Sequence, residues 1–330
     1  MKAAFIRATG PASCIEIGEL PNPEPARGQV RVRMEAVSVN PIDTYIRAGT
    51  VAMDLPDPFV IGCDGAGVVE MLGEGVAGFR EGDRVWFTNQ GLLGRQGTFA
   101  EYAVVDARWL YPLPDGVEAT AAAACALVGV TAHLGLNREA YLRADETVLV
   151  IGGTGGVGSM VVQMAKAAGA KVIATGGGEE KAQLCRELGA DWAIDYQHED
   201  IVQRVEEIIP EGVNVFWETR RIPDFDMAVQ TMAERGRMVL MAGRDARPEF
   251  PVGPFYVKEC KLHGFVMFKA SSDEMRTAAD DINMWLADGS LKPLIAKVLP
   301  LEQAADAHAL QEQATIEGTG SLRGKIVLTI

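Results

Sequence analysis

Cysteine is scarce in this 330-residue chain, and the few copies are scattered. There are five, an odd number, and no two of them form a C-x-x-C pair. This argues against a disulfide framework and against a four-cysteine zinc lobe, and it favours a reducing compartment. The five are Cys14, Cys63, Cys125, Cys185 and Cys260.

Positively charged residues are also outnumbered by negatively charged ones. The chain has 31 lysines and arginines against 45 aspartates and glutamates, a net charge of −14. An acidic surface repels phosphate backbones, so we expect no nucleic-acid partner and predict a small-molecule substrate. The remaining composition, 48% hydrophobic and 23% charged, is that of an ordinary globular protein, and the length suggests two domains.

Apolar runs are too short to cross a membrane. The longest, Ala119–Ala132, has about 14 residues, where roughly 18 are needed, so it predicts a buried helix. The first residues lack the apolar core of a signal peptide. We therefore expect no membrane partner and a cytoplasmic protein.

The first 115 residues are rich in turns and in short strands. Gln29–Met34 alternates polar and apolar residues, as a half-buried strand does, and turn segments rich in proline, aspartate, asparagine or glycine come often, at 21–23, 56–58, 81–83 and 112–116. Such spacing indicates a barrel or a sandwich. The tail from Asp273 contains two helical stretches and a last strand, 325–330, too little for a domain of its own, so we expect it to return to the first domain.

Between these parts, apolar runs alternate with helical stretches. Alternation of this kind predicts a doubly wound parallel sheet with helices on both faces, an α/β fold. The six predicted strands are 147–151, 171–175, 192–195, 213–217, 237–241 and 261–265.

Two segments match the pattern G-x-G-x-x-G. The first, Gly73–Gly78, is followed by a turn, so its glycines are better explained by a hairpin. The second follows the apolar strand 147–151 and opens a helix that Gly169 is placed to end. Glycines let a pyrophosphate approach the backbone, and a helix N-terminus offers it free N–H groups, so this segment predicts a dinucleotide site. Its residues are Gly153, Thr154, Gly155, Gly156, Val157 and Gly158.

The next strand indicates which dinucleotide binds. A site for NAD usually has an acidic residue there, whereas this strand runs into Gly176 and two further glycines, with Lys181 one turn into the following helix. Open space and a cation suit the 2′-phosphate of NADPH, which Tyr196 could cover after the third strand. Two acidic residues, Glu179 and Glu180, lie nearby in the sequence. The alternative explanation for Lys181 is that it is an ordinary solvated surface charge.

Several blocks of residues follow one another in a distinctive order and spacing. They are 40–49, 62–69, 78–85, 97–102 and 155–158, with Gln163 and Lys166 downstream. Together they resemble the zinc-free quinone oxidoreductases (zeta-crystallin-like) of the medium-chain dehydrogenase/reductase superfamily. The resemblance spans essentially the whole chain.

The resemblance implies a GroES-like β-barrel catalytic domain interrupted by a Rossmann domain. The expected boundaries are residues 1–120 for the first part of the catalytic domain, 121–265 for the NADPH-binding domain and 266–330 for the return. It also implies a homodimer. Asn40, Tyr45 and Thr131 are then expected at the nicotinamide end, with Gly243, Phe265 and Met267 around the cofactor. An Asn-Pro turn and barrel packing are the alternative explanations for Asn40 and Tyr45.

Zinc-dependent relatives carry cysteine and histidine ligands where this chain has Asn40, Cys63-Asp64 and Leu127. One thiol beside one carboxylate cannot provide the three ligands of a catalytic zinc site, so we expect no metal. Without a Lewis acid the acceptor must already be electron-poor. The prediction is an NADPH-dependent reductase of quinones; the alternative is a reductase of 2-alkenals, enones or enoyl thioesters. A cofactor-binding protein without catalytic turnover is the third possibility.

Overall fold

A computed structural model describes residues 1–319 and 322–330, which form two compact units. Unit 1 comprises Met1–Leu127 and Ala270–Ile330, and unit 2 comprises Val128–Lys269. The boundaries expected from the sequence were after residues 120 and 265.

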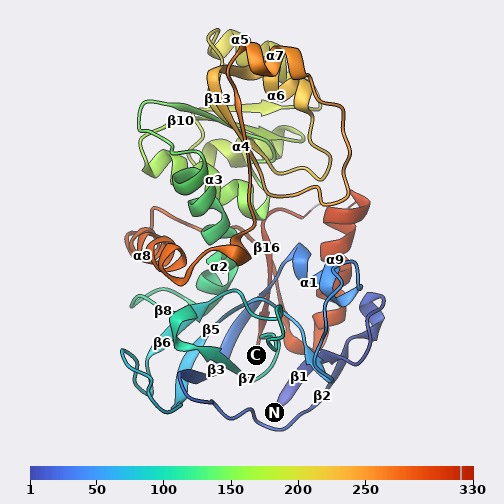
Figure 1. Cartoon of the computed structure of the whole chain (residues 1–330), viewed down its shortest axis with the longest axis vertical. Coiled ribbons are helices and arrows are strands. Elements are labelled where there is room, and N and C mark those ends of the chain that lie inside the picture. The colour runs from blue at the N-terminus through green and yellow to red at the C-terminus, as the bar shows by residue number, and fades with distance from the viewer. Residues whose placement is uncertain (320–321) are drawn as a thin grey trace. The chain divides into compact units, whose positions relative to one another are not determined.

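Unit 2 is built on a six-stranded parallel sheet (Figure 1). Its order, β11-β10-β9-β12-β13-β14, is the strand order 3-2-1-4-5-6 of a Rossmann fold. All six predicted strands are confirmed. Their bounds are Thr147–Val150 (β9), Lys171–Gly176 (β10), Trp192–Asp195 (β11), Val213–Glu218 (β12), Met232–Leu240 (β13) and Lys261–Gly264 (β14).

Helices cover both faces of this sheet because each right-handed crossover places its helix on one side. Helices α3 and α4 lie on one face, and α5, α6 and α7 lie on the other (Figure 1). The second group packs Val205, Ala228 and Phe255 into a core with Leu149 and Phe216 of the sheet. The bounds are Gly156–Ala167 (α3), Glu179–Glu187 (α4), Ile201–Ile208 (α5), Phe225–Thr231 (α6) and Val252–Val257 (α7).

Unit 1 contains a seven-stranded and a three-stranded sheet. The larger has the order β15-β16-β3-β5-β6-β8, with β7 also paired to β3, and the smaller has the order β2-β1-β4. The bounds are Lys2–Ile6 (β1), Glu16–Glu19 (β2), Gln29–Val39 (β3), Phe59–Val60 (β4), Asp64–Leu72 (β5), Arg84–Phe87 (β6), Tyr102–Asp106 (β7), Leu110–Pro112 (β8), Ile295–Pro300 (β15) and Lys325–Thr329 (β16).

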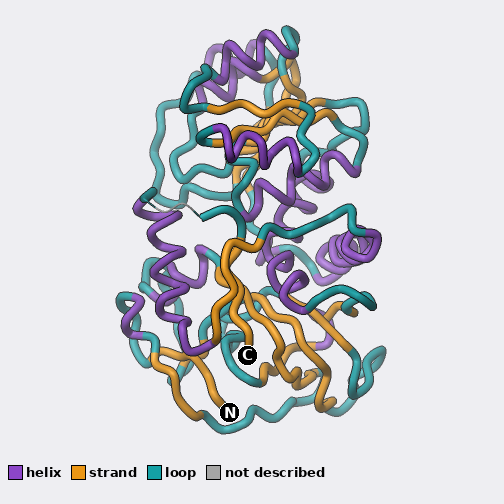
Figure 2. Tube along the Cα trace, turned by 180° about the vertical axis from the view of Figure 1, so that it is seen from behind, coloured by secondary structure: helices purple, strands orange, loops and turns teal. Residues whose placement is uncertain are grey.

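The last strand, β16, pairs antiparallel with β3, so the end of the chain completes the seven-stranded sheet of unit 1. The C-terminus lies among these strands (Figure 2). The helices of this unit are Pro41–Arg47 (α1), Ser272–Asp288 (α8) and Ala304–Glu312 (α9). Single turns of 3-10 or π-helix occur at Ala12–Cys14, Ala107–Trp109, Gly135–Glu139, Met267–Lys269, Leu301–Gln303 and Gln313–Glu317.

The apolar run predicted as a buried helix is α2, Ala119–Leu134. It continues through the π-helical turn to Glu139, which gives 21 residues, longer than the sequence suggested. By length and composition alone this segment could cross a membrane, but 83% of its most apolar window is buried inside the protein. It is a core helix.

Candidate active site

The second glycine segment forms the turn between β9 and α3. Gly152 has φ +77°, and a Cβ built on Gly158 would lie 2.1 Å from the Gly152 carbonyl oxygen. Gly155 caps the helix, and nothing but that carbonyl lies near the Cβ position of Gly155. The first N–H groups of α3 have no acceptor within the helix, so this turn is an open cradle for phosphate oxygens. As predicted, Gly73–Gly78 leads into a turn and not into a helix.

A second group lies where β10 and β11 end. Gly176 ends β10, and a Cβ there would meet the backbone of Lys181 at 2.7 Å. Lys181 is in the first turn of α4, and Tyr196 directly follows β11. A Cβ on Gly177 would lie 2.5 Å from the Tyr196 hydroxyl, so this tyrosine lies over the glycine loop. The structure therefore brings together the residues predicted for the 2′-phosphate.

Asp195 was not predicted, although it organises this loop. Its Oδ1 accepts from the N–H groups of Gly178 at 2.7 Å and Gln197 at 3.1 Å, and its Oδ2 lies 2.7 Å from His198 Nδ1. The His198 hydrogen bond lowers the pKa of Asp195, and the backbone donors add to this. The Asp195 carboxylate thus makes its hydrogen bonds to the loop whose conformation it fixes. An acidic residue at a strand end was the only signal in the sequence.

The other predicted cofactor residues follow β13 and β14. Gly243 has φ +88° and lies close to the Arg221 carbonyl. Phe265 follows the edge strand β14, and Met267 beyond it is buried. Since the carboxyl ends of parallel strands share one edge of the sheet, these residues lie on the same edge as the glycine turn.

Glu218, at the end of β12, is almost fully buried and holds Arg220 by a two-pronged ion pair. The shortest N–O distance in that pair is 2.7 Å. Arg220 is therefore a partner of Glu218 at this edge.

Unit 1 contains a buried polar cluster that the sequence did not predict. Lys325 Nζ donates to the Val39 carbonyl at 2.7 Å and to Asn40 Oδ1. Asn40 Nδ2 and Ser38 Oγ both donate to Asp64 Oδ2, at 2.8 and 3.0 Å. Asp43 Oδ2 accepts from the Asn40 N–H at 2.8 Å. The cluster consists of Ser38, Asn40, Asp43, Cys63, Asp64 and Lys325.

Burial dominates the electrostatics of this cluster. It raises the pKa of Asp43 to about 7, the Cys63 thiol opposes this rise and the charge of Asp64 adds to it. Burial also raises the pKa of Asp64, against the effect of the Lys325 ammonium, and it lowers the pKa of Lys325. The pKa of Cys63 lies well above its usual value for the same reason, so the group is a thiol and not a thiolate.

The three predicted catalytic residues lie in different surroundings. Asn40 is fully buried: its Oδ1 accepts from Lys325, and its Nδ2 donates to Asp64 at 2.8 Å and lies 3.5 Å from the Ser38 carbonyl oxygen. Tyr45 lies in α1 and is half-buried. Thr131 is buried in α2 and belongs to unit 2. Asp43 holds the start of α1 through the Asn40 N–H.

The donor set does not fit a zinc ion. Within residues 1–319 and 322–330, no three histidine, cysteine or acidic side chains are grouped as ligands. The Cys63 thiol has a raised pKa, and the ammonium of Lys325 lies among the carboxyls. A metal would need the thiol deprotonated and the ammonium removed.

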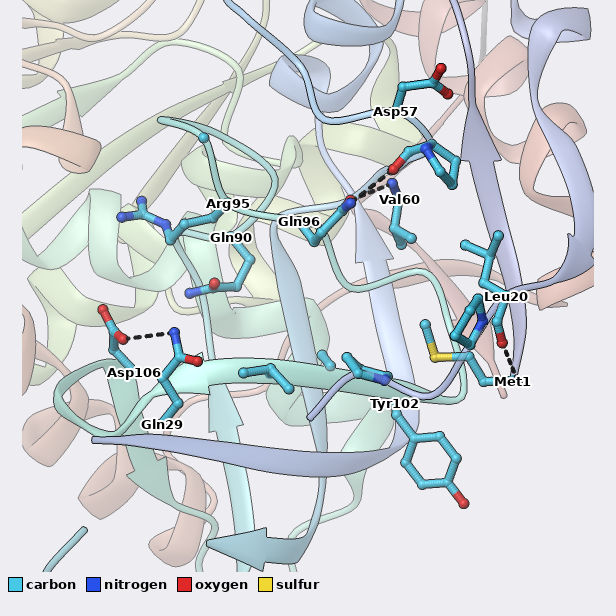
Figure 3. A pocket seen from close by; sticks show the side chains of 17 residues that line it. Met1, Leu20, Gln29, Asp57, Val60, Gln90, Arg95, Gln96, Tyr102 and Asp106 are labelled. Atoms are coloured by element: carbon cyan, nitrogen blue, oxygen red, sulfur yellow. Dashed lines mark hydrogen bonds between the residues drawn. The ribbon is translucent and has the colours of Figure 1, made fainter. Parts of the chain in front are cut away.

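A cavity of about 470 Å³ lies elsewhere in unit 1, between β7 and the segments around Val60 and Gln96 (Figure 3). Gln96 is tied to Val60 and Pro58, and Gln29 to Asp106, across its walls. None of the predicted site residues lines it.

Comparisons with known proteins agree with both units. The model for the alcohol dehydrogenase GroES-like domain matches residues 26–115, and the model for the zinc-binding dehydrogenase matches residues 156–283. The quinone oxidoreductase of Pseudomonas aeruginosa is 33% identical over 324 residues, 95% of this chain and 96% of that one. The human quinone oxidoreductase is 30% identical over 309 residues, 93% and 91% of the two chains.

Two solved structures cover this chain completely and are themselves covered completely. The Escherichia coli quinone oxidoreductase complexed with NADPH has a TM-score of 0.86 at 28% identity. An NAD-dependent alcohol dehydrogenase has a TM-score of 0.90 at 31% identity. The chain belongs to the quinone oxidoreductase family of the medium-chain dehydrogenase/reductase superfamily, and it is an oxidoreductase.

Proposed function

We propose that the protein is an NADPH-dependent, metal-free reductase of quinones. The observation that carries the proposal is the loop after β10, where Gly176 ends the strand, Lys181 lies in the first turn of α4 and the Tyr196 hydroxyl lies over Gly177. A cation and a tyrosine hydroxyl suit a 2′-phosphate, and Asp195, the nearby acid, is already occupied by Gly178 and His198. Relatives crystallised with NADPH support this choice, and the NAD-dependent neighbour makes cofactor preference the first property to measure.

The cradle of α3 would hold the pyrophosphate, and Lys181 and Tyr196 the 2′-phosphate. When bound, NADPH supplies the hydride for the reduction. Phe265, Met267 and Gly243 would border the nicotinamide, with Thr131 nearby. We assign to Tyr45 the role of hydrogen-bond donor to the acceptor oxygen, because it is a half-buried residue of the short helix α1 and its phenolic hydroxyl can donate. Asn40 then serves to hold that helix and not to contact the acceptor.

The acceptor class follows from the polar cluster of unit 1. Its donor set does not fit zinc, so the reaction has no Lewis acid to polarise an unactivated ketone. A quinone already has a low-lying acceptor orbital and needs only a hydrogen-bond donor for its developing phenolate. The second candidate is reduction of a 2-alkenal, an enone or an enoyl thioester. Tyr45 favours it, because its phenolic hydroxyl can donate a hydrogen bond and an enolate needs such a donor more than a quinone does.

We also propose a homodimer that works in the cytoplasm. Within the described residues, the edge strand β14 pairs with β13 alone, and Leu262 is 41% exposed on it. Tyr256 and Val257 of α7 are 67% and 69% exposed close by in the chain. An open strand edge with apolar neighbours is a surface for pairing with a second copy, so we place the dimer interface there. Sedimentation of wild type and of the Leu262→Glu variant tests both statements: a monomeric wild type would contradict the dimer, and a dimer that persists in the variant would contradict this interface.

The experiment that tests the function is an acceptor screen on the purified protein. NADPH oxidation is measured with 1,4-benzoquinone, with a 2-alkenal and with a simple ketone, with and without chelator, beside elemental analysis for zinc. We expect turnover with the quinone, none with the ketone and no loss in chelator. About one zinc per chain together with loss of activity on its removal would refute the metal-free mechanism.

A further inference from the structure

The buried ammonium of Lys325 clamps the junction where β3 ends and α1 begins. Lys325 is 4% exposed at the start of β16, and its Nζ donates to the Val39 carbonyl at 2.7 Å and to Asn40 Oδ1. Ile326, the next residue, is paired with Val39 across the sheet. The end of the chain therefore holds two successive acceptors at the point from which α1 departs.

Asn40 is fixed at this junction from three sides. Its Oδ1 accepts from Lys325, its Nδ2 donates to Asp64 at 2.8 Å, and its main-chain N–H donates to Asp43 at 2.8 Å. An ammonium can only donate and a carboxylate can only accept, so the amide has one orientation. Because Asn40 precedes the first residue of α1, this orientation sets the direction in which the helix leaves β3.

Helix α1 has seven residues, Pro41–Arg47, and Tyr45 lies in it. A helix of two turns has little stability of its own, so its ends determine where it lies. Its far end is held by Arg47, which donates to the Gly10 carbonyl at 2.6 Å and pairs with Glu312. The near end is held by the cluster around Asn40.

We propose that Lys325 is a positioning residue that places the Tyr45 hydroxyl through Asn40 and the start of α1. This rests on the proposed function, in which Tyr45 donates to the acceptor oxygen. Without the ammonium, Asn40 Oδ1 loses its donor, and Asp64 loses the only cation among its cluster partners. The amide then keeps only its contacts on the Nδ2 side, and the start of α1 is held by fewer bonds than before.

The test is a double-mutant cycle of Lys325→Met and Tyr45→Phe, measured with a 2-alkenal and with 1,4-benzoquinone. Lys325→Met keeps the length of the side chain and removes its donors. We expect it to lower kcat by roughly ten- to a hundredfold on the acceptor for which Tyr45→Phe does so, since misplacements of about 1 Å have such effects. The dissociation constant of NADPH should stay unchanged, and the double variant should be no slower than the slower single variant.

Two further variants keep the outcome interpretable. Lys297→Met, on the exposed part of neighbouring β15, is the matched control and should change nothing. Lys325→Arg keeps donors and charge; it should recover part of the activity, and it replaces Lys325→Met in the cycle if that variant does not fold. Hydrogen exchange of residues 43–48 should be faster in Lys325→Met.

The outcomes separate the two proposals. If the effects of the two single substitutions multiply in the double variant, Lys325 does not act through Tyr45 and the positioning role is refuted, while the function stands. If Tyr45→Phe slows neither acceptor, the role proposed for Tyr45 fails and the positioning role fails with it. Equal losses in NADPH affinity and in kcat would mean that Lys325 serves only the fold.

Discussion

Asp43 should make the stability of unit 1 depend on pH, and Asp43→Asn should remove that dependence. The side chain is 3% exposed, and burial raises its pKa to about 7, from 3.8 for an ordinary aspartate. Between about pH 4 and pH 7 the folded protein keeps a proton on Asp43 that the unfolded chain has lost. The free energy of unfolding therefore falls as the pH rises through this window. A difference of about three pKa units corresponds to about 4 kcal/mol.

Asparagine keeps the contact that the carboxyl makes. Its amide oxygen can accept from the Asn40 N–H, as Asp43 Oδ2 does at 2.8 Å. Asp43 Oδ1 has no hydrogen-bond partner within the described residues, so an amide NH₂ in its place breaks no bond. Wild type and variant should be about equally stable at pH 4. At pH 8 the variant should be more stable by up to about 4 kcal/mol, a shift in the urea midpoint on the order of 1–2 M.

The assay is urea unfolding followed by tryptophan fluorescence, repeated from pH 4 to pH 8 on both proteins. Asp115→Asn, in an exposed turn, is the matched control and should follow the wild-type profile. The raised pKa of Asp64 also lowers the free energy of unfolding as the pH rises, but Asp64 is present in both proteins. The difference between the two pH profiles therefore reports on Asp43. Identical pH profiles for wild type and Asp43→Asn would refute the reasoning, because Asp43 would then be as acidic in the fold as in the unfolded chain.

Three further predictions concern the proposed site. Lys181→Ala should weaken NADPH about ten- to a hundredfold and leave NADH unchanged in calorimetric titration, since a charge-assisted contact contributes roughly 1.5–3 kcal/mol; equal weakening of both would assign Lys181 to the fold. Gly177→Ala places a Cβ 2.5 Å from the Tyr196 hydroxyl, so it should displace that ring and raise the KM for NADPH more than for NADH. An unchanged ratio would separate Tyr196 from the phosphate. Tyr45→Phe should reduce kcat strongly for an enone and weakly for a quinone at nearly constant NADPH affinity, because loss of one such donor elsewhere costs about 2.7–4 kcal/mol. A loss confined to cofactor binding would place Tyr45 against the nicotinamide.

The parallel sheet could be predicted because its signals are local. The central strands β9, β10 and β12 are short apolar runs, buried almost throughout and each followed by a helix, and this pattern does not depend on distant residues. The largest error is β13, which begins at Met232 and not at Arg237. Glu234, Arg235 and Gly236 interrupt the apolar pattern there, and the pairing with β12 shifts register between Val213 and Val215. A bulged strand of this kind has no period for the sequence to reveal.

The glycine turn was predictable for the same reason, since strand, turn and helix follow one another within 20 residues. The polar cluster was not. Lys325 and Asn40 are 285 positions apart, and each has a plain local explanation, a charge at a strand start and an Asn-Pro turn. Only the pairing of β16 with β3 brings them together. The sequence therefore does not show that the amide of Asn40 is engaged by Lys325 at one end and by Asp64 at the other.

The charges of the cluster support the proposal that no metal binds at this place. Two carboxyls and one ammonium are buried together, and a proton on Asp43 leaves the Asp64–Lys325 pair as a neutral unit. A divalent cation would add two charges to a site that is already balanced, and it would have to displace the ammonium that orients Asn40. The lysine supplies the positive charge, and it also holds the backbone at the start of α1. On the proposed function, the acceptor must therefore accept hydride with a hydrogen bond alone, which is why an electron-poor acceptor and a hydrogen bond from Tyr45 belong to the same proposal.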